Sequence, residues 1–110
     1  MSKINNINML LHKAVSLNAS DIHIKVGSPP IVRVNGQLFP LLDEPKMKKE
    51  DTLKIASSVL NEKQQAILNK KREIDTAYSI LGLSRFRCNI FFQRGTISAV
   101  FRVIPFGVKS

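Results

Sequence analysis

Apolar positions along this chain repeat with two different periods, and each period predicts a different kind of element. An amphipathic helix is predicted over about residues 4–17, where apolar side chains recur at helical spacing: Ile4, Ile7, Leu10, Leu11, Ala14 and Leu17. Helical patterns return at about residues 48–60 and 62–71. The first of these is expected to bury Leu53, Ala56, Val59 and Leu60, and the second to begin with a capping box of Asn61 and Gln64.

Strict alternation of apolar and polar residues predicts strands in the rest of the chain. In residues 21–26, three apolar side chains are expected to face inward and Asp21, His23 and Lys25 to face outward. Strands over residues 31–34 and 37–42 flank Asn35-Gly36, a strong signal for a two-residue hairpin turn. Another strand is predicted over residues 74–80, before a last hairpin. The order predicts an α+β fold with a largely antiparallel sheet of about six strands, on which the helices pack.

The last hairpin carries Arg85, Arg87, Arg94 and Arg102, and no Asp or Glu follows Asp75 in the chain. Side chains alternate across a strand, so Arg85, Arg87, Asn89 and Phe91 are expected on one face and Phe86, Cys88, Ile90 and Phe92 on the core face. Each arginine taken singly can be solvated or paired with a distant acid. The set, without acids of its own region, favours an anionic partner, because guanidiniums bind phosphate or carboxylate through paired donors.

Length and charge limit the classes of function. The chain has 110 residues, enough for one domain with its own core. Its 17 Lys and Arg against 8 Asp and Glu give a net charge of +9, which raises the question of a nucleic-acid or membrane-surface partner. No RNP-like, zinc-finger or helix-turn-helix signature is present, so no nucleic acid is expected. No apolar run has the length of a membrane span, so no membrane insertion is expected.

Residue types that commonly carry catalysis or bind metals are few. No glycine is followed by lysine, so the chain lacks a Walker-type phosphate loop. His12 and His23 have no cysteine or carboxylate cluster at metal-ligand spacing, so no metal site is expected. Asp21 and His23 share a strand face, where such a pair can orient a base, but no nucleophile lies near them in the sequence. We therefore expect a structural or docking contact for this pair, with neither catalysis nor a cofactor for this chain alone. Cys88 is expected to be a core residue.

Four collinear motifs resemble one protein family. They are Ala19-Ser-Asp-Ile-His-Ile24, Pro29-Pro-Ile-Val-Arg-Val-Asn-Gly36, Arg85-Phe-Arg-Cys-Asn-Ile-Phe-Phe-Gln-Arg-Gly95 and Phe101-Arg-Val-Ile-Pro105. In this order and spacing, the chain is similar to the type IV pilus retraction (twitching motility) ATPases of the secretion-ATPase superfamily. The resemblance covers only the family's N-terminal, PAS-like domain. Residues 1–106 are expected to form that domain, and residues 107–110 to begin the linker to an absent RecA-like ATPase domain.

The resemblance implies a full-length protein that is a cytoplasmic, hexameric ATPase, peripheral to the inner membrane, which drives pilus disassembly. ATP and Mg²⁺ would be its cofactors. Its partners would be the neighbouring subunits of a homohexamer, through the motor domain, and the inner-membrane pilus machinery. The N-terminal domain would have a regulatory and oligomerisation role, packing on the neighbouring motor domain and offering arginines to its nucleotide phosphates.

Individual residues take roles from the same resemblance. The positions that match arginines of the family pattern are Arg85, Arg87 and Arg102, followed by Arg94, which lies at a turn, and Arg33, which can serve an interface. Asp21 and His23 match the family's Ser-Asp-x-His motif and are assigned to domain packing or the subunit interface.

Two positions depart from the usual pattern. Lys48 stands where a helix-capping Ser or Thr is usual, which weakens the helix start by about 1 kcal/mol. Cys88 replaces the commoner Val. The short segment before Ala19 favours the retraction branch over the pilus-assembly and type II secretion ATPases, which share parts of these motifs. Two further alternatives are a stand-alone PAS-like module that binds a ligand in its core, and a basic nucleic-acid binder with steeply salt-dependent binding.

Overall fold

The computed structural model of the chain describes residues 6–104, which form three helices and six strands. In chain order they are α1 (Ile7–Ser16), β1 (Asp21–Ile24), β2 (Ile31–Val34), β3 (Gln37–Pro40), α2 (Lys49–Val59), α3 (Glu62–Lys71), β4 (Glu73–Ile80), β5 (Ser84–Gln93) and β6 (Thr96–Ile104). The predicted α+β class is confirmed. Ile4, predicted in the first helix, and the predicted domain boundary at 106 with a linker from 107 lie outside the described residues.

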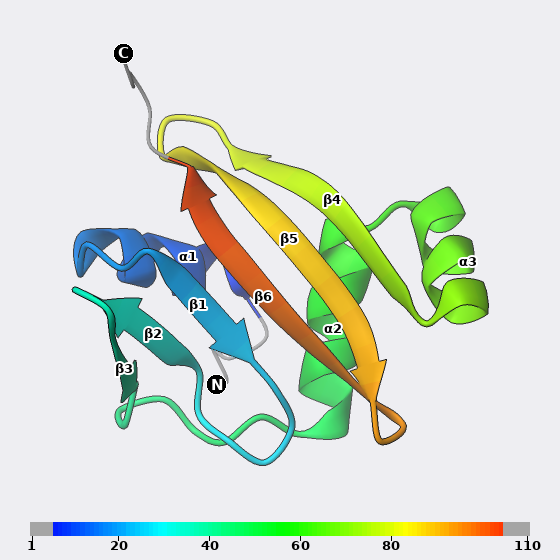
Figure 1. The fold of residues 1–110 in the computed structure, drawn as a ribbon, viewed down its shortest axis with the longest axis horizontal. Coiled ribbons are helices and arrows are strands. Elements are labelled where there is room, and N and C mark those ends of the chain that lie inside the picture. The colour runs from blue at the N-terminus through cyan, green and yellow to red at the C-terminus, as the bar shows by residue number, and fades with distance from the viewer. Residues whose placement is uncertain (1–5, 105–110) are drawn as a thin grey trace.

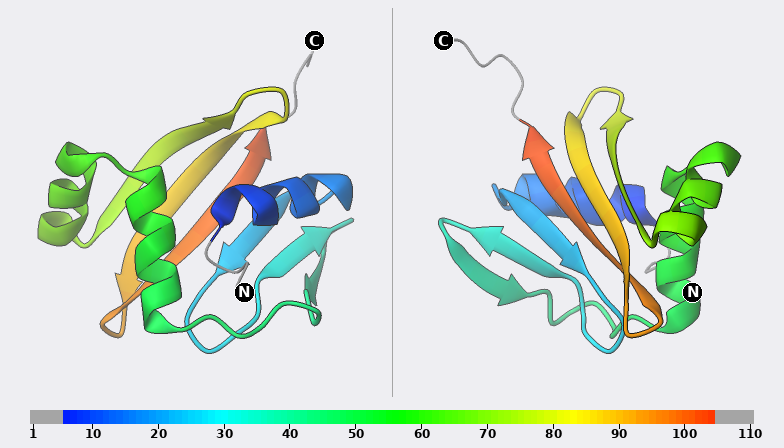
Figure 2. Two further views of the ribbon diagram at one scale, coloured as in Figure 1. Left: turned by 180° about the vertical axis from the view of Figure 1, so that it is seen from behind. Right: turned by 45° about the vertical axis from the view of Figure 1, so that its right-hand side comes forward.

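The six strands form a single sheet in the order β3-β2-β1-β6-β5-β4, and all neighbouring strands are antiparallel. Helices α1 and α2 lie across one face of this sheet, and α3 lies beside the edge strand β4 (Figure 1). Figure 2, which includes a view from behind, shows α1 and α2 in front of the strands. We call this side the helix face. The other side, which no helix of residues 6–104 covers, is the open face.

The core lies between the sheet and the helices, and strand alternation selects its residues. From β5 and β6 it takes the buried side chains Phe86, Cys88, Ile90, Ala99 and Phe101. The first helix adds its predicted apolar stripe, with Ile7, Leu10, Leu11 and Ala14 buried. Burial raises the pKa of the Cys88 thiol to about 12, so this cysteine stays a neutral packing residue at physiological pH.

Side-chain caps fix where the two mid-chain helices begin. The predicted capping box of α3 is confirmed, since the Gln64 N–H donates to Asn61 Oδ1 at 2.8 Å and the Asn61 N–H donates to Gln64 Oε1 at 2.9 Å. At the start of α2, Lys48 offers no side-chain acceptor, but its own N–H donates to the Asp51 carboxylate at 2.7 Å. One of the two hydrogen bonds of a capping box therefore remains at the start of α2. It offsets part of the loss of helix stability expected from Lys48 at the cap position.

Two predictions about burial are wrong. Leu53 is 50% exposed, because α2 packs across β6 with the stripe that contains Thr52, Ile55 and Ala56. Asp21 lies on the open face, as predicted, yet it is only 6% exposed, since neighbouring side chains enclose its carboxylate. The predicted third strand is also too long. The strand β3 ends at Pro40, and the next residue, Leu41, is buried.

The corrected stripe of α2 leads to a stability prediction. We expect Ile55→Ala to lower the free energy of unfolding by about 2–5 kcal/mol. The Ile55 side chain is only 1% exposed, so its truncation leaves a cavity in the core. Leu53→Ala, on the same helix, should change it by no more than about 0.5 kcal/mol. Urea unfolding followed by circular dichroism measures both. Equal losses in the two variants would contradict the observed orientation of α2.

Candidate functional site

A row of four charged residues crosses the open face. The strand register places Asp21 of β1 opposite both Arg33 of β2 and Arg102 of β6, and it places Arg102 opposite Arg87 of β5. We call Arg33, Asp21, Arg102 and Arg87 the arginine row, in their order across the sheet. Residues directly opposite one another have Cβ atoms about 4.5–5.5 Å apart. The fold therefore brings together three of the five arginines that sequence analysis selected.

One half of the arginine row is neutralised within the chain. Arg33 Nε donates to Asp21 Oδ2 at 3.2 Å, and His23 Nε2 lies 3.3 Å from the same oxygen. Arg33 also donates to the carbonyl oxygen of Gly36 at 3.1 Å. Burial raises the pKa of Asp21, but hydrogen bonds from Ser20, Arg33 and His23 outweigh burial and hold this pKa below its usual range. The Asp21 carboxylate is thus ionised and committed to Arg33 and His23.

The other half of the arginine row is not neutralised. Arg87 and Arg102 are exposed, and among residues 6–104 no carboxylate forms a salt bridge with either of them. They line a shallow hollow of about 500 Å³ together with Asp75, Asn89 and Val100. Asp75, which precedes the last hairpin, therefore reaches this region, where it lies 3.4 Å from the Asn89 amide nitrogen. Two guanidiniums against one carboxylate leave the hollow net positive.

This geometry suits an oxyanion. Like charges directly opposite on neighbouring strands destabilise a sheet, and an anion between them removes that repulsion. Guanidiniums donate paired N–H groups that match phosphate and carboxylate oxygens. Arg85 lies on the same face, two residues before Arg87 and roughly 7 Å from it along the strand, as predicted. It can therefore extend the positive surface around the hollow.

Arg94 does not belong to this cluster. It occupies the β5–β6 turn with a φ of 54°, followed by Gly95 with a φ of 83°. The strand between Arg87 and Arg94 spans roughly 20 Å, at about 3.3 Å per residue. A single phosphate cannot touch both side chains. Three of the five candidate arginines thus belong to the arginine row. Arg85 lies beside the row, and Arg94 lies apart from it.

Sequence analysis missed two polar residues of the hollow as candidates. Strand alternation predicts the correct face for Asn89 but no role for it, and in the sequence Asp75 is only the last acid before the arginines. The register of β4 with β5 sets Asp75 opposite Asn89. Gly82, with a φ of 81°, lies in the turn between β4 and β5. A glycine at this place is a turn signal that could have identified the pair, because residues equidistant from a hairpin turn become cross-strand neighbours.

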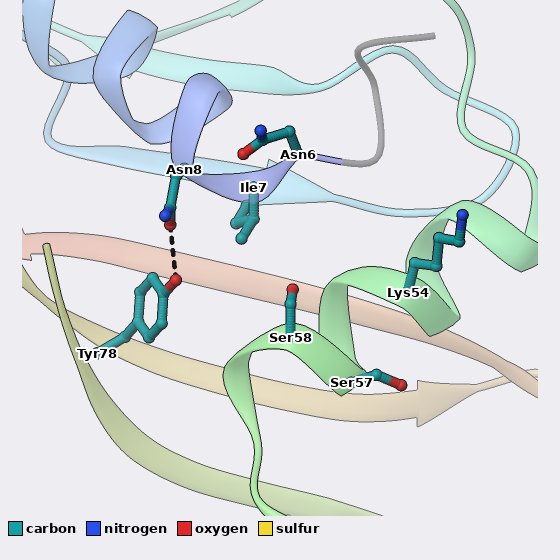
Figure 3. A pocket seen from close by; sticks show the side chains of 7 residues that line it. All are labelled: Asn6, Ile7, Asn8, Lys54, Ser57, Ser58 and Tyr78. Carbon is teal, nitrogen blue, oxygen red and sulfur yellow. Dashed lines mark hydrogen bonds between the residues drawn. The ribbon is translucent and has the colours of Figure 1, made fainter.

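A second hollow lies on the helix side, between α1, α2 and β4. Its lining residues are Asn6, Ile7, Asn8, Lys54, Ser57, Ser58 and Tyr78 (Figure 3). The Tyr78 hydroxyl donates to Asn8 Oδ1 at 2.6 Å, so these two groups satisfy each other. Lys54 and Ser57 point away from this pair in Figure 3. The hollow is superficial, since most of its lining is exposed, and it does not provide the enclosed core pocket that a ligand-sensing module needs.

Within residues 6–104, no group of three or more His, Cys, Asp or Glu could hold a metal ion. None of the helices in that range is long and apolar enough to cross a membrane.

The Asp21 contacts predict a pH-dependent stability difference. Since folding lowers the pKa of Asp21, its ionised carboxylate contributes its full stabilisation above the unfolded value of about 3.9, and this is lost as the pH falls through the folded pKa. Asp21→Asn should therefore cost about 1–3 kcal/mol at pH 6–7, and the deficit should shrink below about pH 4. Urea unfolding across this pH range measures it. Asp75→Asn is the matched control, and an Asp21→Asn deficit that is independent of pH would contradict the ion pair.

The chain is similar in sequence to known type IV pilus ATPases. No family model matches the chain. It is 32% identical over 100 residues to the type IV pilus retraction ATPase PilT of Pseudomonas aeruginosa, covering 91% of this chain and 29% of PilT. It is 35% identical over 101 residues to the type IV pilus ATPase PilU of the same organism, covering 92% of this chain and 26% of PilU. The chain thus spans less than a third of the length of these relatives.

A solved structure shares the fold. The crystal structure of the pilus retraction motor PilT with bound ADP superposes with a TM-score of 0.86 and 36% sequence identity, covering 99% of this chain and 31% of that one. The match includes the six-stranded antiparallel sheet and the helices of the PilT N-terminal domain. Sequence and fold together therefore identify the chain as a domain of the PilT-type pilus ATPases, equivalent to their N-terminal domain.

Proposed function

We propose that this chain is the N-terminal, PAS-like domain, residues 1–106, of a hexameric type IV pilus retraction ATPase. In the ring it packs on the neighbouring subunit's motor domain and offers Arg87 and Arg102 to the nucleotide phosphates bound there. The observation that carries this proposal is the adjacent pair of exposed guanidiniums, which no salt bridge within residues 6–104 neutralises. The similarity to PilT, whose crystal structure holds ADP, supplies a phosphate ligand of matching charge.

The chemistry of phosphoryl transfer explains why such a pair is useful. Negative charge on the phosphate oxygens must be stabilised during transfer, and prepositioned guanidiniums stabilise it without having to reorganise. The sheet holds Arg87 and Arg102 on neighbouring strands, so both can donate to one phosphate. Arg85 supplies a further cation on the same face. Arg94 has a different role in this proposal, because it lies too far from the pair to share that phosphate.

The neutralised half of the arginine row serves a different purpose. Asp21 holds Arg33 and His23, so its carboxylate is not available to quench Arg102. His23 keeps a third of its side chain exposed and can contact a neighbouring subunit. We assign Asp21, His23 and Arg33 to domain packing and the subunit interface.

The remaining properties of the parent follow the family. ATP and Mg²⁺ are its cofactors, and they bind to the motor domain, since this chain carries no Walker loop. This chain alone is not an enzyme in this proposal. We place the parent in the cytoplasm at the inner membrane, where pilus machinery is its partner. A second assignment, to another pilus ATPase of the PilU type, is favoured by the similar identities of 35% to PilU and 32% to PilT.

The test uses the full-length protein that contains this chain. We expect Arg87→Ala and Arg102→Ala each to lower ATP turnover by about tenfold or more, which corresponds to about 1.4 kcal/mol of lost transition-state stabilisation. Light scattering should show unchanged hexamers, and the exposed Lys63→Gln on α3 should leave turnover unaltered. Unchanged turnover in both arginine variants would contradict the phosphate contact. A loss that accompanies dissociation of the ring would assign the arginines to assembly instead.

A further inference from the structure

We propose a second oxyanion site on the open face, at the β5–β6 turn, formed by Lys25, Arg94 and Ser98. Its ligand is a phosphate group, either free or at the end of a nucleotide. Along the strands, Arg94 lies roughly 20 Å from Arg87 and Ser98 lies roughly 13 Å from Arg102, at about 3.3 Å per residue. It stands independently of the proposed function, because it rests on different residues and a different hollow.

The site is a hollow of about 380 Å³ whose charged lining residues are all cations. Its lining residues are Lys25, Val26, Gln93, Arg94, Thr96 and Ser98. Two of these are cations and none is an acid. The remaining polar groups are the Gln93 amide and the hydroxyls of Thr96 and Ser98, and of these the amide and the Ser98 hydroxyl can donate hydrogen bonds to a ligand. A hollow with this lining selects anions.

Ser98 is the most informative residue of this hollow. It is only 5% exposed, and among the described residues its hydroxyl makes no hydrogen bond. Thr96, in the same hollow, instead donates to the Gln93 carbonyl oxygen at 3.2 Å. Buried polar groups are normally paired, so an unpaired buried hydroxyl needs an explanation. A ligand in the hollow would accept the hydrogen bond that Ser98 leaves free.

The strand register places Lys25 beside Ser98. Ile24 of β1 lies opposite Ala99 of β6. Lys25 follows Ile24 and Ser98 precedes Ala99, so the antiparallel register brings these two residues to the same level. By strand alternation, both side chains lie on the open face of the sheet, as do those of Asp21 and Arg102 further along the strands.

Arg94 occupies a backbone position for which arginine is a poor choice. With φ of 54° and 83°, Arg94 and Gly95 adopt the same left-handed turn as Asn35 and Gly36, with φ of 51° and 80°. Asparagine is favoured at the first position of such turns, because it tolerates the left-handed region. Arginine at this position leaves the backbone strained, and asparagine would relieve that strain. Retained backbone strain of this kind is a feature of functional sites.

The donors together favour phosphate over a monovalent anion. A guanidinium offers a planar fork, an ammonium offers a compact charge, and the hydroxyl offers one further donor. Two positive charges and donors from three strands or turns match a dianion with several oxygens. The same set around a carboxylate would leave one positive charge unmatched.

The test is a titration of this chain with inorganic phosphate, and separately with ATP, followed by amide NMR shifts at constant ionic strength set with chloride. Shifts should concentrate at residues 25 and 94–98. Arg94→Asn removes the charge and retains the turn, so it should weaken phosphate binding about tenfold, or about 1.4 kcal/mol. Lys63→Gln, which removes one charge from α3, should leave binding unchanged.

Ser98→Ala separates binding from folding. It should weaken phosphate binding while leaving the melting temperature equal or higher, because it deletes a buried hydroxyl without a partner. Shifts with inorganic phosphate support a free phosphate as ligand, and shifts with ATP alone support a nucleotide phosphate. The proposal is overturned if Arg94→Asn binds as tightly as the wild type, or if the only shifts lie at the arginine row.

Discussion

Antiparallel pairing of β5 with β6 sets Cys88 opposite Phe101 and Arg87 opposite Arg102, so one register determines both the core and the charged open face. Phe86 and Phe101 are fully buried, and each contributes about 1.5–3 kcal/mol by leaving water. Repulsion between two exposed guanidiniums is smaller, at about 0.2–1 kcal/mol. Core burial therefore outweighs the repulsion and holds the arginine pair in place. A slip of one residue would reverse both faces at once.

Local patterns were sufficient to predict much of this arrangement. The alternation of Arg85, Phe86, Arg87 and Cys88 assigned both faces of β5 correctly, because side-chain direction depends only on position within the strand. The Asn35-Gly36 turn and the Asn61–Gln64 capping box were equally accessible, since each depends on residues within one turn of the chain. The family resemblance followed from motifs that lie in these same segments.

Contacts between distant segments could not be predicted from local sequence patterns. Asp21 becomes the neighbour of Arg102 only because β1 inserts beside β6, and no local pattern specifies that strand order. The enclosure of Asp21 by Arg33 and His23, and so its burial, depends on the same order. For α2, helical spacing permitted either Leu53 or Ile55 to face the sheet. The packing of α2 across β6 selected Ile55.

The central claim is that Arg87 and Arg102 are unneutralised in this chain whereas Arg33 is paired. The most direct measurement compares the free energies of unfolding of Arg87→Gln, Arg102→Gln and Arg33→Gln at low ionic strength. We predict that the first two are unchanged or raised by up to about 0.5 kcal/mol, because a like-charge contact is removed. Arg33→Gln should lower the value by about 1–3 kcal/mol. A loss for Arg102→Gln as large as that for Arg33→Gln would contradict the account, because it would make Arg102 a structural partner of Asp21.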